Sequence, residues 1–429
     1  MTDGNDRFHI HRDTLTGETV YYVTHPTGVK IAICPKPEKK IAYATFGVKY
    51  GSIDNDFKVN GGEFTCVPDG IAHYLEHKLF ENEDCGAFER YAKTGASANA
   101  YTSYDKTCYY FSCTRHFEQA FEILLDFVQN PYFTEESVQK ERGIIVQEIQ
   151  MYQDSPGSKV YSNLMKAMYL DHPIKNDVAG TVESISQITP ELLYQCYNTF
   201  YNPKNMVLAV AGKVDPQEVL SMCDRLLLPK EKLEIVSRHP EDNGRIVQPF
   251  IEEELDVPFP LFQLGFKESW RQLSERERIL SGIIRNAVFG PISDFYDRMI
   301  RKQLINPGFG HNSIEVEGAM ASVFQGMSRF PEALRDEIFE EIERVKREGI
   351  SPRIFECARR SSYGGNITAF NYTEDIADNL QDDIMFGIDT FGLLKAAASV
   401  TVEEANELFR RQYDISNSSL SVVRRSKEA

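Results

Sequence analysis

The chain has 429 residues, 42% of them hydrophobic and 26% charged, and a formal net charge of -17. This length exceeds what one hydrophobic core usually supports, so we expect an ordinary globular protein of at least two domains. The acidic balance repels phosphate backbones, and the basic pairs along the chain are isolated, which argues against nucleic acid binding.

The N-terminus and the hydropathy pattern bear on location. Residues 1–7 are polar and acidic, and no apolar segment of a signal peptide follows them. No apolar stretch approaches the roughly 18–20 residues needed to span a bilayer. We therefore expect a cytoplasmic protein that contacts no membrane.

The first half opens with strand-like runs at residues 21–23, 29–33 and 42–48. In these runs apolar and polar side chains alternate, or β-branched and aromatic side chains are frequent. A helix is predicted over residues 70–80 and a further strand over residues 107–112. Helical periodicity then covers residues 117–128 and 135–152, with Thr134 as the expected N-cap of the second helix.

The second half repeats part of the first half. Residues 229–249 are polar and contain proline and glycine, so they predict a linker, and a strand-like run follows at 262–266. Residues 401–420 match residues 189–208 without a gap, and each copy predicts a helix, a polar turn and a strand. We therefore expect two homologous α+β domains, residues 1–228 and 250–429, each a largely antiparallel sheet packed on helices as a two-layer α/β sandwich.

The eight cysteines are scattered and form no Cys-x-x-Cys pair. In a cytoplasmic chain this pattern is typical of free, mostly buried thiols. Cys66 and Cys85 flank the histidine motif described next, but neither has metal-site spacing to another cysteine, so we rank both low as ligands.

Two histidines, His73 and His77, lie four residues apart within a predicted helix. That spacing places both imidazoles on one helix face, close enough to bind a single ion. Glu76 points to nearly the same side and is positioned to hold the water of a hydrolytic reaction. By itself the pentad His-x-x-Glu-His is also compatible with a satisfied pair of core histidines.

A catalytic zinc site needs three protein ligands and an open position. The predicted helix at 135–152 offers Glu141 and Glu148, which lie nearly two turns apart and so share one face, while we expect its isoleucines to pack elsewhere (Ile144, Ile145 and Ile149). The spacing of the two glutamates fits either metal ligands or a charged helix face exposed to solvent.

Taken together, these motifs resemble the pitrilysin/insulinase family of zinc peptidases, whose metal motif is inverted relative to His-Glu-x-x-His. The resemblance covers residues 40–220 in family order, with weaker patterns beyond. It rests on Gly70–Phe80 together with four further segments: Tyr50-Gly51-Ser52, Ala98-Asn99-Ala100-Tyr101-Thr102-Ser103, Glu141-Arg142-x5-Glu148 and Tyr201-x-Pro203-x-Asn205-Met206.

The resemblance implies one Zn²⁺ per chain, bound by His73, His77 and Glu148, with Glu76 as general base. It also implies the fold of the LuxS and metallopeptidase type, in which one chain forms half of a clamshell chamber. Glu141 would be an accessory carboxylate beside the metal.

The segment containing Asn99 and Ala100 matches the edge strand that holds extended substrate in this family. Pairing through the backbone makes recognition depend more on an extended conformation than on sequence. Asn99 is alternatively a turn residue in a loop rich in small side chains.

The C-terminal half is expected to be a degenerate, inactive repeat, because no second His-x-x-Glu-His motif exists. Aligning residues 352–365 with the helix that carries Glu141 and Glu148 places Ala358 and Gly365 at the two carboxylate positions.

The family's second half usually supplies an Arg and a Tyr that bind substrate and stabilise the oxyanion. Here Ile300 stands where the Arg is expected, and Asn306 or Pro307 where the Tyr is expected; Arg298 or Arg301 is a possible substitute. We therefore hypothesise a homodimer or a heterodimer in which a related subunit supplies the pair.

The segments at residues 76–84 and 95–99 look most like a YmfH-type cytoplasmic subgroup of Gram-positive bacteria, which is linked by name to modification of elongation factor P. The leading hypothesis is a zinc endopeptidase that cleaves unstructured peptides inside a closed chamber. The alternative is a binding or assembly subunit without useful turnover. A structural zinc protein is poorly supported, because structural sites are usually closed and rich in cysteine.

Overall fold

The computed structural model describes residues 7–83, 85–240 and 244–425. Residues 1–6, residue 84 of the 76–84 segment and residues 241–243 of the predicted linker lie outside this description. The chain forms two compact units, each built from three stretches of sequence. The first unit comprises residues 1–147, 177–238 and 367–390, and the second comprises residues 148–176, 239–366 and 391–429.

The first unit is built on a mixed sheet in the order β1-β2-β3-β9-β4-β8-β7. All neighbours pair antiparallel except β3 and β9, which are parallel. The strands are β1 (His9–Arg12), β2 (Thr19–Thr24), β3 (Lys30–Pro35), β4 (Ala42–Val48), β7 (Ser97–Thr102), β8 (Thr107–Cys113) and β9 (Met206–Gly212). Central strands β4 and β9 are buried along their whole length.

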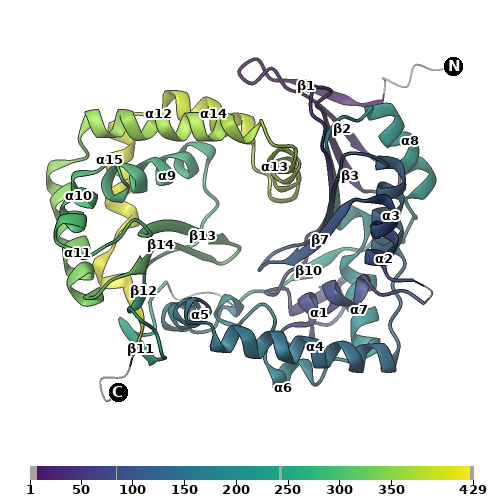
Figure 1. Ribbon diagram of the computed structural model, residues 1–429, viewed down its shortest axis with the longest axis horizontal. Coiled ribbons are helices and arrows are strands. Elements are labelled where there is room, and N and C mark those ends of the chain that lie inside the picture. The colour runs from purple at the N-terminus through teal and green to yellow at the C-terminus, as the bar shows by residue number, and fades with distance from the viewer. Residues whose placement is uncertain (1–6, 84, 241–243, 426–429) are drawn as a thin grey trace. The chain divides into compact units, whose positions relative to one another are not determined.

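Helices cover both faces of this sheet, with α3 and α8 on one face and α13 on the other (Figure 1). The helices of the unit are α1 (Ile71–Leu79), α2 (Ala87–Thr94), α3 (Phe117–Gln129), α4 (Glu135–Asp154), α6 (Val182–Ile185), α7 (Pro190–Phe200), α8 (Pro216–Leu226) and α13 (Thr373–Phe386), with η3 (Pro203–Asn205) before β9. Helix α4 continues past Gln147 into the second unit without a break. The expected cap is present, because Thr134 Oγ1 accepts from the Ser137 N–H at 3.1 Å.

A small antiparallel sheet, β10-β5-β6, completes the first unit. Its strands are β5 (Asp56–Val59), β6 (Thr65–Cys66) and β10 (Ile235–Ser237). Strand β10 lies inside the predicted linker, so that part of residues 229–249 is not a free connection but a strand paired with β5. The domain boundaries expected from the sequence stay a prediction.

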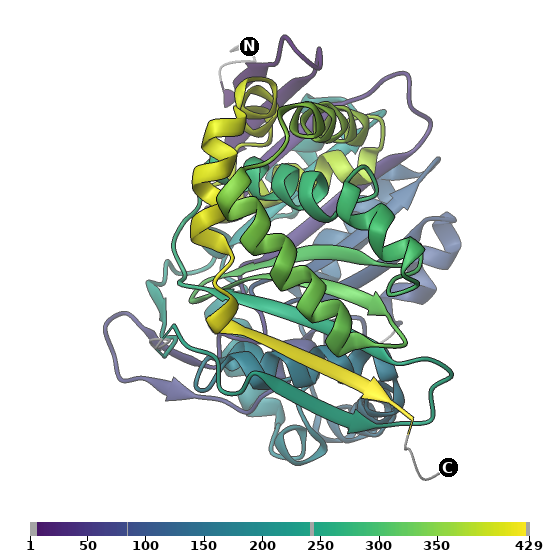
Figure 2. The same ribbon diagram turned by 90° about the vertical axis from the view of Figure 1, so that its left-hand side faces the viewer.

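The second unit repeats the architecture with a sheet in the order β11-β15-β12-β14-β13. Strands β11 and β15 lie side by side and run parallel (Figure 2), and the other pairs are antiparallel. The strands are β11 (Phe250–Glu254), β12 (Leu261–Glu268), β13 (Gly310–Val316), β14 (Ala319–Met327) and β15 (Ser418–Arg424). The helices are α5 (Pro156–Met168), η2 (Pro173–Lys175), α9 (Glu275–Phe289), α10 (Asp294–Arg301), α11 (Pro331–Glu348), α12 (Pro352–Ala369), α14 (Thr390–Ser399), α15 (Val402–Gln412) and η4 (Ile415–Asn417).

The predicted repeat is confirmed. Every boundary of α7, η3 and β9 recurs in α15, η4 and β15 at the same interval along the chain. Five strands of each sheet also follow the same order with the same directions, because β3-β9-β4-β8-β7 corresponds to β11-β15-β12-β14-β13. The expected α+β class, with two similar units of largely antiparallel sheet packed on helices, is therefore confirmed, although helices cover both faces of the first sheet.

The two units exchange one helix each. Helix α5 packs on β15, β12 and β11 of the second unit, and α13 packs on the equivalent strands β9, β4 and β3 of the first. A glycine lies beneath each exchanged helix: a Cβ at Gly47 of β4 would lie 2.7 Å from Gln381, and one at Gly265 of β12 would lie 2.3 Å from Met168 Sδ. Glycine at these places lets a helix lie close to the sheet.

Other sequence-based expectations concern the thiols and the surface. The described cysteines are free, and five of the eight are buried, whereas Cys66 and Cys357 are exposed.

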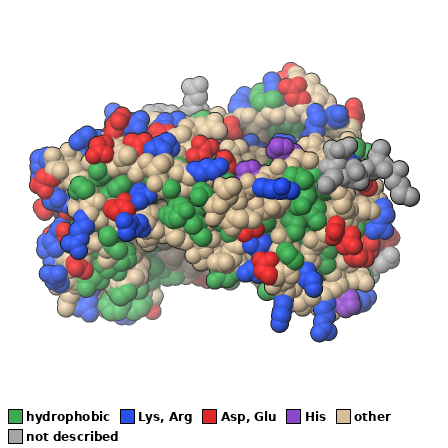
Figure 3. Space-filling view, turned by 90° about the horizontal axis from the view of Figure 1, so that it is seen from above, with side chains coloured by type: hydrophobic (Ala, Val, Ile, Leu, Met, Phe, Trp, Pro, Cys, Tyr) green, Lys and Arg blue, Asp and Glu red, His purple; other side chains and the backbone are tan. Residues whose placement is uncertain are grey.

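Acidic and basic side chains are interspersed over the described part of the face that Figure 3 shows. Among the described helices, none combines the length and apolar content needed to span a lipid bilayer.

We predict that Gly265→Ala destabilises the protein by about 1–3 kcal/mol, because the new methyl group overpacks the interface with Met168. Gly282→Ala is the matched control: it lies in α9, where an added Cβ meets nothing within 4 Å, and Ala should stabilise the helix by about 0.5–1 kcal/mol. Urea unfolding of the three proteins measures both effects. Equal midpoints for Gly265→Ala and wild type would contradict the packing argument.

Candidate metal centre

The start of helix α1 is set by two facing glycines. Gly70 precedes the helix with a left-handed φ of 89°. A Cβ at Gly70 would lie 2.5 Å from the Ala179 carbonyl oxygen, and one at Gly180 would lie 2.5 Å from the Asp69 carbonyl oxygen. The two loops therefore touch, and the Ser184 hydroxyl donates to the Asp69 carbonyl at 2.8 Å. This contact fixes where the helix begins, and so where its histidines lie.

The apolar side of α1 then anchors the helix in the core. Its nonpolar residues are almost fully buried (Ile71, Ala72, Tyr74, Leu75 and Leu79). The Tyr74 hydroxyl donates a hydrogen bond to the backbone carbonyl of Val138 in α4. Helices α1 and α4, which are distant in sequence, are thereby held against each other.

This packing brings His73, His77 and Glu148 together. One ligand atom from each residue lies within 4.8 Å of the others. The imidazole ring centroids are 4.6 Å apart. Because α4 is one continuous helix through Glu148, the carboxylate is carried by the same element that packs on α1. Two imidazoles and one carboxylate form the donor set of a catalytic zinc site, so these residues fit the metal implied by the sequence.

Glu141 holds one of the imidazoles. Its Oε1 lies 2.8 Å from His77 Nδ1, so that nitrogen donates the hydrogen bond and Nε2 is left to face an ion. Burial acts to raise the pKa of Glu141, but the hydrogen bond and the charge of His77, together with Lys78, outweigh it and lower the pKa below its ordinary value. Glu141 therefore stays ionised as a partner of the ligand.

Glu76 is held by strand β7. It is buried, with 8% of its surface exposed, and its Oε2 accepts a hydrogen bond of 2.8 Å from the Thr102 hydroxyl. Nearby, burial and the charge of Glu76 raise the pKa of Tyr109 and Tyr201, whose hydroxyl oxygens are 2.7 Å apart. Sequence reasoning missed Thr102, although it lies in the quoted Asn-Ala-Tyr-Thr segment.

Asn99 and Ala100 lie in β7, the last strand of the first sheet. Asn99 is opposite Tyr110 and Ala100 opposite Tyr109 in β8, so they belong to a regular edge strand rather than to a turn. The Asn99 side-chain oxygen accepts a hydrogen bond of 2.9 Å from the Ala100 N–H. Among the described residues, β7 pairs with β8 along one edge, and no strand pairs with its other edge.

The expectation for the isoleucines of α4 was wrong in one case. Ile145 and Ile149 are buried, but Ile144 is 47% exposed. At about 100° of rotation per residue, Ile145 and Ile149 lie roughly 40° and 80° to one side of Glu141, whereas Ile144 lies roughly 60° to the other side. Ile144 therefore points away from the core that the other two isoleucines enter.

The strand register identifies the equivalent place in the second unit. Gly47 and Gly265 are equivalent beneath the exchanged helices, and following the pairing outward from them aligns Thr102 of β7 with Ser313 of β13. Aligning the buried residues of α9 with those of α1 places Gly282, Arg285 and Asn286 where α1 carries its His-x-x-Glu-His motif. Arg285 donates to Ser313 Oγ at 3.3 Å, in the position of the contact between Thr102 and Glu76.

The second unit therefore carries other side chains at the positions of His73, Glu76 and His77. On α12, Ala358 is fully buried and an added Cβ at Gly365 meets nothing within 4 Å, so neither position offers a carboxylate. Among the described residues, the cluster of His73, His77 and Glu148 is the one with metal-ligand spacing.

The residues considered as substitutes for the family's Arg lie on α10. Arg298 pairs with the buried Glu341 at 2.7 Å, and Arg301 is exposed and lies 3.6 Å from Asp297. Arg298 thus has a structural partner within its own unit.

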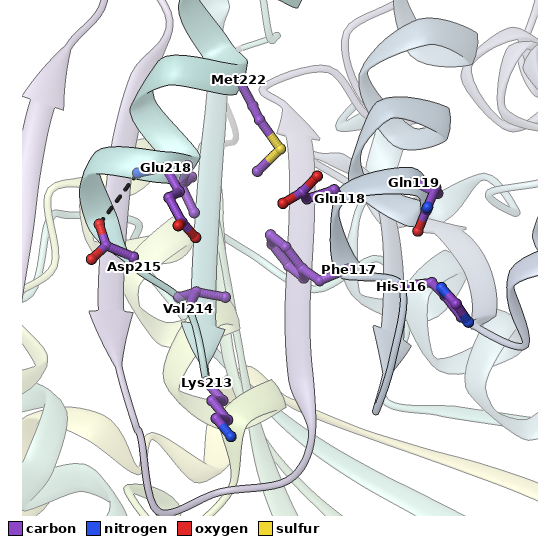
Figure 4. A pocket seen from close by; sticks show the side chains of 10 residues that line it. His116, Phe117, Glu118, Gln119, Lys213, Val214, Asp215, Glu218 and Met222 are labelled. Carbon is purple, nitrogen blue, oxygen red and sulfur yellow. Dashed lines mark hydrogen bonds between the residues drawn. The ribbon is translucent and has the colours of Figure 1, made fainter.

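A separate cavity of about 340 Å³ lies between the N-terminal ends of α3 and α8 (Figure 4). Its acidic residues include Glu118, Asp215 and Glu218. Asp215 is used to cap α8, because its Oδ1 accepts from the Gln217 N–H at 2.7 Å. This cavity does not include the histidine cluster.

Comparison with known proteins identifies the family of this chain. Residues 30–182 match the family described as insulinase (peptidase family M16), and residues 187–362 match the peptidase M16 inactive domain. A Bacillus subtilis (strain 168) protein, described as the uncharacterized zinc protease YmfH, is 36% identical over 404 residues, which is 92% of this chain and 94% of that protein. The chain belongs to the insulinase family, peptidase family M16, and the predicted resemblance to YmfH is confirmed.

Solved structures agree. A putative M16-like peptidase from Alicyclobacillus acidocaldarius superposes with a TM-score of 0.92 at 32% identity and covers 98% of this chain and 99% of that chain. The periplasmic protease PqqL from Escherichia coli superposes with a TM-score of 0.71 at 18% identity, covering 94% of this chain and 47% of that one. At this identity, the similarity to PqqL shows a shared fold and carries no information on activity.

We predict that Glu141→Ala weakens zinc binding about 10- to 100-fold, as loss of a carboxylate that orients a ligand commonly does. Glu141→Gln keeps an acceptor for His77 and should weaken binding less. Competition with a chelator measures the affinities, and the exposed Glu136→Gln is the control. Wild-type affinity in Glu141→Ala would show that His77 needs no such support.

Proposed function

We propose that the chain is a zinc-dependent endopeptidase that cleaves peptides or unfolded segments held in an extended conformation. The observation that supports this most directly is the convergence of two histidines and one carboxylate beside the buried carboxylate of Glu76. The zinc protease names carried by relatives support the same metal and reaction class.

The metal would be bound by His73, His77 and Glu148. When bound, zinc supplies Lewis acidity, which lowers the pKa of a water molecule toward about 7 and polarises a carbonyl group. Glu76 would accept the proton of the attacking water and pass it to the leaving amine. The hydrogen bond from Thr102 keeps the carboxylate of Glu76 in one orientation for this transfer.

The substrate would bind along the outer edge of β7. An edge strand presents backbone N–H and C=O groups that pair with an extended peptide. The Ala100 N–H is held by the Asn99 side chain, so rotation of that side chain would release the donor to a substrate carbonyl. Recognition through the backbone selects unfolded segments of varied sequence.

A second subunit is part of this proposal. Ile300 stands where the family's substrate-binding Arg is expected, and Asn306 or Pro307 where its Tyr is expected. Arg298 is paired with Glu341. The chain matches about half of PqqL, which is consistent with a second set of two units completing the enzyme. A related subunit that carries the pair would supply the Arg and Tyr.

The second candidate function is a binding or assembly subunit without turnover. The substituted Arg and Tyr positions favour it, as does the match of residues 187–362 to an inactive domain. The intact set of His73, Glu76, His77 and Glu148 favours the peptidase, because a scaffold does not need all four groups.

We predict that Glu76→Gln retains zinc but cleaves an unstructured fluorogenic peptide at least about 100-fold more slowly, which is the usual contribution of a general base. Metal analysis and initial rates are measured on the same samples, with the exposed Glu63→Gln as control. Equal cleavage by Glu76→Gln and wild type would refute the assignment of Glu76.

We also predict that the purified chain alone is a weak peptidase and that a related subunit carrying the Arg and Tyr pair raises the rate by about 100-fold, since oxyanion stabilisation contributes 10²–10³ in rate. Native mass spectrometry and peptide cleavage at the same protein concentration test this. Full turnover by a monomeric chain would exclude the need for a partner.

A further inference from the structure

Glu148 has a neighbour on its own helix that the metal-site motif does not include. The Tyr152 hydroxyl donates a hydrogen bond of 2.9 Å to Glu148 Oε1. Tyr152 lies one turn further along α4, and side chains on a helix lean toward its N-terminus. The phenol therefore reaches back over the carboxylate, although its own side chain is 44% exposed.

The other two carboxylates of the site are held by their surroundings. Glu76 and Glu141 are at least nine-tenths buried, and they accept from Thr102 and His77. Glu148 is only partly buried. A half-buried glutamate has more rotamers open to it than a buried one, and the hydrogen bond from Tyr152 restricts them.

A phenol is chemically suited to that task. Its neutral hydroxyl carries one donor proton and no charge. A phenol therefore donates to a carboxylate and leaves in place the negative charge that attracts a cation. An Arg or Lys side chain would neutralise that charge. A carboxylate has about four lone-pair sites, so the contact with Tyr152 leaves capacity for an ion.

The degenerate repeat provides an internal comparison. Helix α12 corresponds to α4 in the second unit, and Gly365 stands at the position of Glu148. At the same alignment Ala369 stands at the position of Tyr152. The helix that lacks the carboxylate thus also lacks the phenol.

We propose that Tyr152 is a positioning residue for the metal ligand Glu148. It acts through that carboxylate by restricting its rotation and keeping it directed at the two imidazoles. This inference rests on the proposed zinc site, and it adds to that site a residue outside the His-x-x-Glu-His motif.

The test is zinc affinity in Tyr152→Phe, which removes only the hydroxyl. We expect the dissociation constant, measured by chelator competition, to rise about 10-fold, the lower end of the effect of groups that support a metal ligand. Tyr372→Phe, which removes a hydroxyl from a residue that is 54% exposed, should bind zinc like wild type. The visible spectrum of the cobalt-loaded protein should change in Tyr152→Phe, because it depends on ligand geometry.

The outcomes separate this inference from the proposed function. A wild-type chain that binds no zinc would remove the metal site itself. If wild type binds zinc, and Tyr152→Phe binds it with the same affinity and gives the same cobalt spectrum, the role of Tyr152 is overturned and the metal site stands. A lowered melting temperature of metal-free Tyr152→Phe would assign the hydroxyl a packing role and would also overturn it, since the positioning role predicts an unchanged metal-free protein.

Discussion

The candidate site depends on the packing of α1 against α4. Each helix carries part of the donor set, and neither part binds a metal by itself. Burial of the apolar side of α1 and the hydrogen bond from Tyr74 to Val138 hold the two helices together. The same contact places Glu141 against His77. These two hydrogen bonds, together with the packing of α1 on β7, β8 and α7, thus position the polar groups of the candidate site.

Around that interface, the reactive groups are fixed by hydrogen bonds from groups of different chemistry. A carboxylate supports the imidazole of His77, and a threonine hydroxyl supports Glu76. A phenol supports Glu148. The choice follows from charge: a carboxylate partner makes an imidazole a better ligand, while neutral donors orient acidic groups without neutralising them. Buried groups of this kind would be costly if left without partners.

The second unit shows how little of the fold depends on the site. It keeps the strand order, the parallel pair and the exchanged helix of the first unit, yet Arg285 stands at the place of Glu76 and Gly365 at the place of Glu148. Replacing these few polar residues leaves the apolar faces of α9 and α12 intact, because the side chains that pack the core point elsewhere. Fold and chemistry are therefore encoded by different residues of the same elements.

The sequence by itself determined the local features: the strands and helices, the repeat, and the pentad containing His73 and His77, because periodicity and spacing are properties of short segments. It could not choose between a ligand and a solvated face for Glu148, since both give the same helical spacing, and it placed Ile144 wrongly. Only the tertiary structure brought α4 to α1, made part of the expected linker into a strand, and exchanged α5 and α13 between the units. These features depend on contacts between residues far apart in the chain, which local patterns do not specify.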